Sequence, residues 1–516
     1  MKKEFASGIR TALLTAAAAV IIGGAAFGAE GGDVLPQVLL NSQWDWYSTG
    51  EPTYKDLFHN QYELARLDRE SAAVYPELDS ALKDWSAEKQ ADEENYNSYM
   101  HELADDYNAN GAQVLPLKGQ SDLYVRRADE KVLSLLELSS SYEGGVHGMY
   151  GFSGYNFDSR TGEKLTLDSV FLNTEDLPGL IAGSLRKTYP EKSFFSPDET
   201  LAEDYAKGRY KDWNWTLDPN GVTFYFAPYY LASYADGALE AFIPFRGNES
   251  IFTGAFGEQT GAWAMGMPDY FTQNYMKSDG SWHTLSLMGT PDSYDAYVGL
   301  TIEKDGVQTA VADLWYYEAD FSLVHAADGA SYLYAMYTAE NDYTTICVYD
   351  LYGTPYKIAG IDGRFDLRSK DPEDAPEGQW TFVLSHPERF TVNSIIQYLS
   401  TCFGDRDYVP GADGVPVPQT SYYEIDYPRT VTLKMDLTFP GVEYSDGNPE
   451  GKETAEVTVK SGEVLRFWRT DRETYMDLKR EDGSAVRCRL DQDQRWPFRI
   501  NGVDIEEAFD GIMFAG

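Results

Sequence analysis

The chain has 516 residues, of which 43% are hydrophobic and 14% aromatic, so it can form about three domains with buried cores. Its 83 acidic and 42 basic residues give a formal net charge of −41. This charge argues against nucleic acid as a partner, because phosphate binding needs a basic surface. The aromatic content argues against a disordered acidic tail. The charge favours cationic partners or counter-ions, and a purely solubilising role explains it equally well.

Residues 1–29 have the order of a secretory signal, with a basic start, an apolar run over residues 12–22 and small residues before Glu30. We predict cleavage near Ala26 or Ala29, and an extracellular or cell-surface location. The apolar run is shorter than the ~20 residues that a membrane span needs, and no later stretch is as apolar, so we expect no span after cleavage. An uncleaved anchor is the alternative.

Residues 34–250 are predicted to form an α+β domain. A helix is expected from Pro76 to the stop signal Asn110-Gly111, because apolar residues recur there at steps of three and four. Residues 34–64 show no clean periodicity. The other elements expected in this domain are strands at 130–142, 149–158, 213–217, 222–231 and 238–245, and helices at 175–188 and 197–208.

The remainder of the chain is predicted to be mainly β. Residues 260–365 consist of short alternating runs interrupted by Gly, Asp and Asn, typical of a sandwich, a barrel or a partial propeller. Residues 366–427 read as a linker and irregular region, with a helix over 394–403. Residues 428–516 read as a small β-domain. The predicted fold class is therefore an α+β N-terminal domain followed by a mainly-β C-terminal half.

Three widely spaced cysteines, Cys347, Cys402 and Cys488, allow either one disulfide with one remaining thiol or three buried free thiols. An exported eukaryotic domain of this size usually has more cysteines. The signal and the few cysteines together suggest a bacterial exported protein.

Catalytic motifs are mostly absent from the sequence. The six histidines are too scattered for HExxH, and neither GxSxG nor a P-loop occurs. SxxK occurs, for example at Ser86–Lys89, on polar helical stretches where it arises by chance. Oxygen-rich turns at 218–221, 404–414 and 481–484 lack the ordered calcium loop, so we expect no cofactor, with calcium as a weak alternative.

The fragment SYEGGVHGMYGFSGYNFDSRTGEKLTLDSVF, residues 141–171, places His147 among glycines. No second histidine lies nearby to complete a metal site. We therefore expect the imidazole to bond backbone groups at a bend between two strands, rather than to act in catalysis. The candidate fold-defining or partner-binding residues here and in the aromatic run 225–234 are Tyr142, Gly144, Gly145, His147, Gly148, Tyr155, Tyr229 and Tyr230. The aromatic run predicts either core packing or exposed anchors for a protein or a sugar ring.

Residues 123–246 resemble the extracytoplasmic domain of the RsiV-type anti-sigma factors, which also occurs in some secreted peptidoglycan deacetylases. The resemblance rests on Gly-Gly-x-His-Gly and Tyr-Asn-Phe-Asp in the fragment above, and on FYFAPYYLASYADGALEAFIPF at 224–245. The stretch VKSGEVLRFWRTDRETYMDLKREDGSAVRCRLD, residues 459–491, loosely resembles a bacterial SH3-type wall-binding barrel.

The RsiV-type resemblance implies a sensor or accessory module outside the membrane, and in the anti-sigma factor this domain binds lysozyme. The chain shows no sigma-binding segment before its apolar stretch and lacks the deacetylase's histidine pattern, so neither activity is implied. We predict a secreted or surface-associated bacterial binding or sensor module that is not an enzyme, with a cationic, lysozyme-like protein as partner. The alternatives are a cell-wall or glycan binder and a hydrolase with a dispersed site.

Overall fold

The computed structural model describes residues 34–50, 53–269, 271–277, 279–292, 296–312, 314–366, 380–411, 413–427, 429–445, 448–491 and 498–514. All structural statements below concern these residues. The predicted signal at 1–29 lies outside them.

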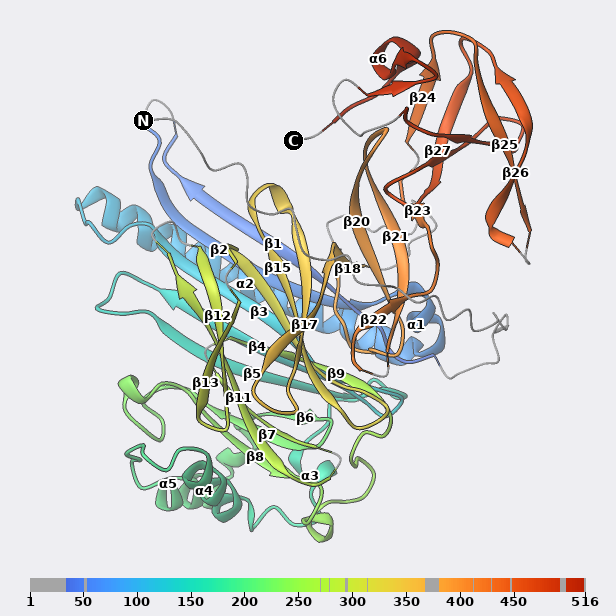
Figure 1. Ribbon diagram of the computed structural model, residues 1–516. Coiled ribbons are helices and arrows are strands. Elements are labelled where there is room, and N and C mark those ends of the chain that lie inside the picture. Colours follow the sequence, from blue (N-terminus) through green and yellow to red (C-terminus); the bar gives the residue numbers. More distant parts are fainter. Residues whose placement is uncertain are drawn as a thin grey trace. The chain divides into compact units, whose positions relative to one another are not determined.

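A six-stranded sheet dominates the N-terminal part, with strand order β19-β1-β2-β3-β4-β5 (Figure 1). Its neighbours are antiparallel except β2 and β3, which run parallel. The strands are β1 (Val38–Ser48), β2 (Asp56–Leu67), β3 (Leu117–Ala128), β4 (Val132–Tyr142), β5 (Met149–Asp158) and β19 (Trp380–Phe382). The predicted strands at 130–142 and 149–158 are confirmed as β4 and β5. Residues 34–64, which showed no periodicity, contain β1 and most of β2.

Helix α2 (Pro76–Ala109) connects the parallel strands β2 and β3, a connection that parallel pairing requires. It follows the short helix α1 (Arg69–Val74) and confirms the predicted helix. Pro76 occupies its first turn, where the missing N–H costs nothing. Leu78, Leu82 and Trp85 of α2 are buried in one core with residues of the sheet such as Leu135.

A second, smaller layer consists of β6 (Asn214–Asp218), β7 (Gly221–Phe226) and β8 (Leu239–Pro244) with the helices α3 (Leu167–Val170), α4 (Leu177–Thr188) and α5 (Pro197–Ala206). The apolar faces of α4 and α5 share a core with these strands. The short 3-10 turns of this region are η1 (Arg209–Asp212), η2 (Tyr234–Asp236) and η3 (Glu249–Ile251). A Cβ on Gly154 of β5 would lie 1.9 Å from the Trp215 carbonyl oxygen, so glycine is required where β5 approaches β6.

Residues 263–362 form two sheets that share one core, as in a sandwich, and residues 364–366 pair with the C-terminal sheet. The first has the order β10-β11-β12-β13 and the second β17-β16-β15-β14-β9. The elements are β9 (Trp263–Met267), β10 (Thr272–Met276), β11 (Trp282–Pro291), β12 (Tyr297–Lys304), β13 (Val307–Ala312), β14 (Glu318–His325), β15 (Ser331–Thr338), η4 (Glu340–Asp342), β16 (Thr344–Asp350), β17 (Tyr356–Asp362) and β18 (Arg364–Asp366). Of the predicted alternatives, this arrangement matches the sandwich.

The C-terminal part is also β-rich, so the predicted mainly-β half is confirmed. Its main sheet runs β18-β20-β21-β23-β27-β28-β29-β25-β26 (Figure 1). The elements are β20 (Phe390–Tyr398), β21 (Ser400–Pro410), β22 (Pro416–Pro418), β23 (Tyr423–Ile425), β24 (Thr430–Leu433), β25 (Leu437–Ser445), β26 (Asn448–Val459), β27 (Val464–Thr470), β28 (Met476–Lys479), β29 (Ala485–Cys488), β30 (Arg499–Ile500), β31 (Val503–Asp504), α6 (Ile505–Ala508) and β32 (Phe509–Asp510).

The predicted helix at 394–403 is wrong, because these residues form the β20–β21 hairpin. Val392, Ser394, Ile396 and Tyr398 are all buried, a period of two that is typical of a strand. A short apolar run cannot be assigned to helix or strand by composition alone, which explains the error. Likewise, 390–427 contains four strands instead of an irregular region.

All three cysteines, Cys347, Cys402 and Cys488, are buried and unpaired, which decides between the two alternatives. Burial raises the pKa of the Cys402 thiol to about 12, so it stays protonated. Within the residues that the structure describes, no helix has both the length and the apolar character to cross a membrane.

Candidate functional site

An open cleft with a volume of about 410 Å³ lies over one end of the six-stranded sheet. Every strand from β1 to β5 contributes to it, and a loop between β7 and β8 supplies one more residue. The side chains that line it include Trp44, Trp46, His59, Gln61, Lys118, Gln120, Ser140, Tyr142, Met149, Tyr150 and Tyr234.

The strand register explains why residues so far apart in sequence meet. Trp46 pairs with His59, His59 with Lys118, and Lys118 with Tyr142, so these four form one row across β1 to β4. Residues directly opposite each other on neighbouring strands project to the same face. The adjacent row contains Trp44, Gln61, Gln120, Ser140 and Tyr150.

The cleft faces away from helix α2. Asn60, which alternates with His59 and Gln61, donates from its side chain to Asn97 and Glu93 of the helix at 2.8 and 3.0 Å. Since successive side chains of a strand point to opposite faces, His59 and Gln61 point to the other side of the sheet.

Two exposed tryptophans form the aromatic wall of the cleft. Trp44 is 57% exposed and Trp46 61%, and their ring centroids lie 6.2 Å apart with the planes 20° from parallel. The Trp46 ring centroid lies 4.1 Å from that of His59. Large neighbouring aromatic side chains left in water mark binding surfaces, because their apolar area is available to a ligand.

The rest of the lining is polar and almost uncharged. Amide and hydroxyl groups come from Gln61, Gln120, Ser140 and Tyr150. Burial raises the pKa of Tyr150, so its hydroxyl stays protonated at neutral pH. Among the described lining residues, Lys118 is the one lysine or arginine, and none is Asp or Glu. In a chain with a net charge of −41, a lining without acidic side chains differs from the average composition of the chain.

A second cavity, of about 370 Å³, adjoins the cleft at the same sheet end and shares lining residues with it, among them Gln120, Ser140 and Tyr150. The residues that line only this cavity include Asp92, Glu93, Tyr96 and Ser121. Burial raises the pKa of Tyr96 to about 12. Beside Ser121, the Lys89 ammonium lies 2.5 Å from Glu137 and 3.3 Å from Glu93.

Lys89 and Ser121 are the residue types of a serine–lysine hydrolase, with Lys89 Nζ 2.9 Å from Ser121 Oγ. Their contacts oppose that chemistry. Ser121 donates its hydroxyl to Glu137 at 2.5 Å, and Lys89 is paired with two carboxylates. Burial opposes ionisation of Glu137, but Lys89 and the hydrogen bonds from Lys89, Ser121 and Tyr155 together hold its pKa below the ordinary value. Lys89 donates to Ser121 and to these carboxylates, so its contacts are those of a structural ion pair and not of a general base.

His147 lies in the turn between β4 and β5, as predicted. Its Nδ1 donates to the Gly148 carbonyl oxygen at 2.9 Å. Its Nε2 lies 3.2 Å from the Tyr229 hydroxyl, and its ring stacks on Tyr234 with 3.9 Å between centroids. Tyr234 also donates to the Gly148 carbonyl at 2.7 Å. His147 thus joins the turn to the loop between β7 and β8, beside the rim of the cleft.

The other predicted residues separate into four groups. Tyr142 and Gly148 line the cleft, Gly144 and Gly145 shape the turn, and Tyr229 contacts His147. A Cβ on Gly144 would approach Tyr107 to 2.7 Å, at a φ of +82° that favours glycine.

Tyr155 and Tyr230 are structural. Tyr155 donates to Glu137 at 2.7 Å and packs on Trp85 of α2, and burial, followed by Glu137, raises its pKa. Tyr230 donates to Asp204. Sequence reasoning missed Trp44, Trp46, His59, Gln61, Lys118 and Gln120. The closely spaced tryptophans in QWDW were the one signal that could have identified part of this set.

The turn at 218–221 offers no free carboxylate for calcium. Asp218 accepts from Arg126 through both oxygens, at 3.1 and 2.8 Å, and also from Thr216 and Thr223. Across the described ranges, no group of three or more His, Cys, Asp or Glu side chains is arranged to hold a metal.

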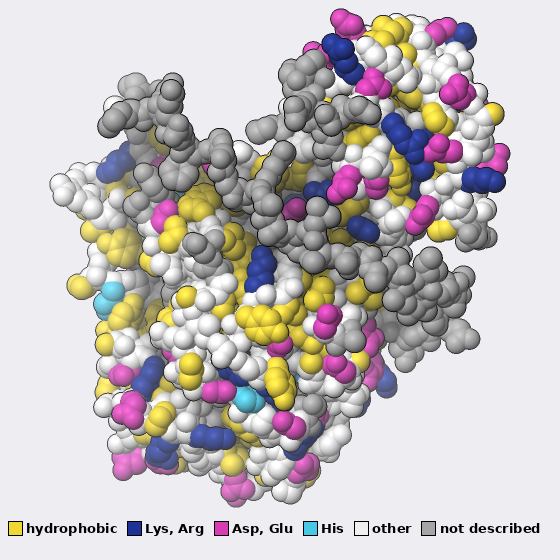
Figure 2. Space-filling view, viewed as in Figure 1, with side chains coloured by type: hydrophobic (Ala, Val, Ile, Leu, Met, Phe, Trp, Pro, Cys, Tyr) yellow, Lys and Arg dark blue, Asp and Glu magenta, His cyan; other side chains and the backbone are white. Residues whose placement is uncertain are grey.

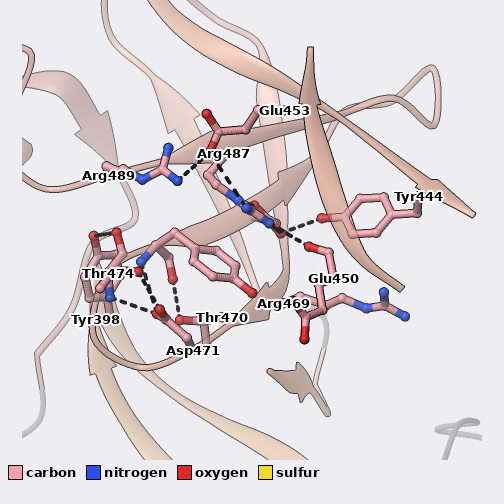
Figure 3. Close-up of polar contacts among 12 residues, drawn as sticks. Tyr398, Tyr444, Glu450, Glu453, Arg469, Thr470, Asp471, Thr474, Arg487 and Arg489 are labelled. Atoms are coloured by element: carbon pink, nitrogen blue, oxygen red, sulfur yellow. Dashed lines mark hydrogen bonds and ion pairs between the residues drawn. The ribbon is translucent and has the colours of Figure 1, made fainter. Parts of the chain in front are cut away.

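A cluster of polar side chains in the C-terminal part is joined by hydrogen bonds and ion pairs (Figure 3). Arg487 donates to Asp477 through two nitrogens at 2.7 and 2.8 Å and to the Glu450 carbonyl at 2.9 Å. Tyr444 also donates to Asp477, and Arg489 to Glu453. These contacts connect strands β25, β26, β28 and β29 of the C-terminal sheet to one another, which is a structural role.

Comparison with known proteins identifies one part of the chain. The family DUF3298, described as a protein of unknown function, matches residues 174–246, which contain α4, α5 and β6 to β8. No curated protein matches the sequence.

Two solved structures of DUF3298 proteins are similar to the chain. One, from Bacteroides fragilis NCTC 9343, is 18% identical, covers 42% of this chain and 94% of its own, and has a TM-score of 0.29. The other, from Pseudomonas aeruginosa PAO1, is 16% identical, covers 44% and 98%, and has a TM-score of 0.30. Scores this low carry no structural argument. The similarity to DUF3298 in sequence thus covers residues 174–246 of this longer chain.

Proposed function

We propose that the chain is an exported, non-enzymatic binding protein whose cleft takes a glycan. The observation that carries this proposal is that exposed Trp44 and Trp46 line the same cleft as neutral amide and hydroxyl side chains. A sugar ring has an apolar face of C–H groups that stacks on an aromatic ring, and hydroxyls that need hydrogen-bonding partners. The two tryptophans stand side by side, which suits consecutive sugars of a chain.

The charges around the cleft support binding without cleavage. Most glycoside hydrolases use two carboxyl groups about 5–10 Å apart across the scissile bond. The described lining of the cleft has no carboxylate. The adjoining cavity has two, Asp92 and Glu93, and Glu93 is paired with Lys89 and accepts from Asn60. The signal-like N-terminus and the RsiV-type and SH3-type resemblances favour a bacterial cell-envelope setting.

Co-sedimentation with purified peptidoglycan tests this proposal. We expect the protein to pellet with the insoluble glycan, and Trp44→Ala/Trp46→Ala to weaken the affinity more than tenfold, since buried aromatic anchors carry most of the energy of such contacts. Tyr427→Ala, at an exposed aromatic outside the cleft, is the matched control and should bind normally. Equal binding by the double variant and the wild type would contradict the assignment of the cleft.

A second candidate partner is a cationic protein such as lysozyme, favoured by the net charge of −41. Calorimetric titration of lysozyme into the protein should release heat at micromolar concentration. Heat that persists at moderate salt indicates a shaped interface, because simple charge attraction is screened. No heat at either low or moderate salt would exclude this partner.

A further inference from the structure

We infer that the cleft selects a glycan that carries a carboxylate, and that Lys118 is the residue that recognises it. This inference rests on the proposed glycan binding. Lys118 lies on β3 in the row Trp46–His59–Lys118–Tyr142, and its side chain is exposed. No other described residue of the cleft lining is a lysine or arginine, and none is an acid that could neutralise it.

The strand spacing gives Lys118 a suitable position. Neighbouring strands lie ~4.8 Å apart, so the Cα atoms of Trp46 and Lys118, two strands from each other, are separated by ~10 Å. A sugar stacked on Trp46 can therefore direct a substituent toward the Lys118 ammonium. His59, between them, is partly covered by the Trp46 ring.

The negative charge of the whole chain increases the importance of Lys118 for binding an anion. Acidic side chains outnumber basic ones two to one, so an anionic polymer is repelled from most of the surface. At physiological ionic strength charges are screened beyond a Debye length of about 8 Å, so the lining, not the distant surface, determines the local potential. There, a carboxylate gains an ion pair with Lys118, whereas a neutral sugar leaves the ammonium to water. Two described acids lie beside the lining without being part of it: Asp122 accepts from Gln120 at 2.8 Å, and Asp56 lies 3.8 Å from His59.

Calorimetry with three soluble oligosaccharides of equal length tests the selection. The probes are a neutral N-acetylated chito-oligosaccharide, the same chain with lactyl carboxyl groups on alternate sugars, and an N-acetylated chain with uronic acids. We expect at least one carboxylated probe to bind about fivefold more tightly than the neutral probe, the gain of one partly exposed ion pair. The preference should fall as salt rises.

Variants connect the preference to Lys118. Lys118→Gln should bind neutral and carboxylated probes equally, and Lys118→Arg should keep the preference. Lys131→Gln, at an exposed lysine in the turn after β3, changes the net charge identically and should behave as the wild type. Unchanged melting temperatures would show that these exposed substitutions leave the fold intact.

The outcomes separate the inference from the proposed function. Equal affinity of the wild type for all three probes, or a preference that persists in Lys118→Gln, overturns the inference and leaves glycan binding in place. Failure of every probe to bind refutes both. A preference for the lactyl chain points to wall glycan and a preference for the uronic chain to an acidic polysaccharide, and either one supports selection by carboxylate.

Discussion

At the scale of single residues, His147 is a connector rather than a catalyst. Its two ring nitrogens bond Gly148 and approach Tyr229, and its face covers Tyr234, so one side chain joins a hairpin turn to a loop about 80 residues later. The glycines around it admit the close backbone approaches of that turn.

Replacing His147 with alanine should therefore lower the stability of the protein and leave glycan binding unchanged. The lost hydrogen bonds lower the free energy of unfolding by about 1 kcal/mol, because each is partly exposed to water. Thermal melting should show the decrease, whereas Val146→Ala, at the fully exposed preceding residue, should melt like the wild type. Loss of glycan binding with an unchanged melting temperature would instead indicate direct contact of His147 with the ligand.

Glu240 on β8 makes stability depend on pH. Burial raises its pKa to about 8, against the opposing charge of Arg126, and one of its oxygens accepts from Gln273 at 2.7 Å. An unfolded glutamate has a pKa near ~4.3. Because the folded-state pKa is the higher one, this residue's contribution is complete below about pH 4 and is lost as the pH rises through about 8.

Glu240→Gln removes this dependence. Between pH 5 and pH 8 we expect the melting temperature of the wild type to fall relative to that of the variant by at least about 3 °C, measured by calorimetry. Parallel curves for the two proteins would show that Glu240 is ionised in the folded state.

At the scale of elements, a bulge in β3 places two arginines in the interior. The register with β4 shifts between Val125 and Arg127, and both Arg126 and Arg127 are fully buried. Arg126 pairs with Asp218 of β6 and donates to the Gly266 carbonyl of β9 at 2.8 Å, so one side chain joins three sheets.

Removing Arg126 should be costly. Arg126→Ala leaves the Asp218 carboxylate buried without its cation, a loss of about 3–5 kcal/mol, which denaturant unfolding would measure. Arg160→Ala, in an exposed turn, provides the control. A change below about 1 kcal/mol in the Arg126 variant would mean that water replaces the pair.

The elements also show where sequence reasoning succeeds. Helices α2, α4 and α5 were predictable because their apolar spacing and terminal Pro and Gly residues are local signals. β1 was not, because Trp44 and Trp46 are apolar yet point to solvent, which obscures the expected alternation. The hairpin at 394–403 was too short and apolar to distinguish from a helix.

The candidate site was predictable only where it is local. The His147 turn is one continuous motif and could be found in the sequence. The cleft depends on the register of four strands that bring Trp46, His59, Lys118 and Tyr142 into one row, and no local pattern encodes which strands will be neighbours. In particular, the sequence does not indicate that β2 and β3, which α2 separates along the chain, pair in parallel and bring His59 beside Lys118.

At the scale of the whole molecule, long-range contacts tie the N-terminal sheet to residues far along the chain. β19 pairs with β1, and Gln37 donates to the Val383 carbonyl at 2.8 Å across 346 positions. The acidic side chains are distributed among basic ones on the face that Figure 2 shows, rather than gathered in one patch. Among the described residues on this face, no acidic patch marks a docking site, so the proposed binding specificity rests on the local surface of the cleft.

A crystal structure of the protein with an N-acetylated tetrasaccharide tests the central claim most directly. The account predicts sugar rings stacked on Trp44 and Trp46, with hydroxyls bonded to Gln61, Gln120 or Ser140. A saccharide bound elsewhere, with the two tryptophans still exposed to solvent, would contradict it.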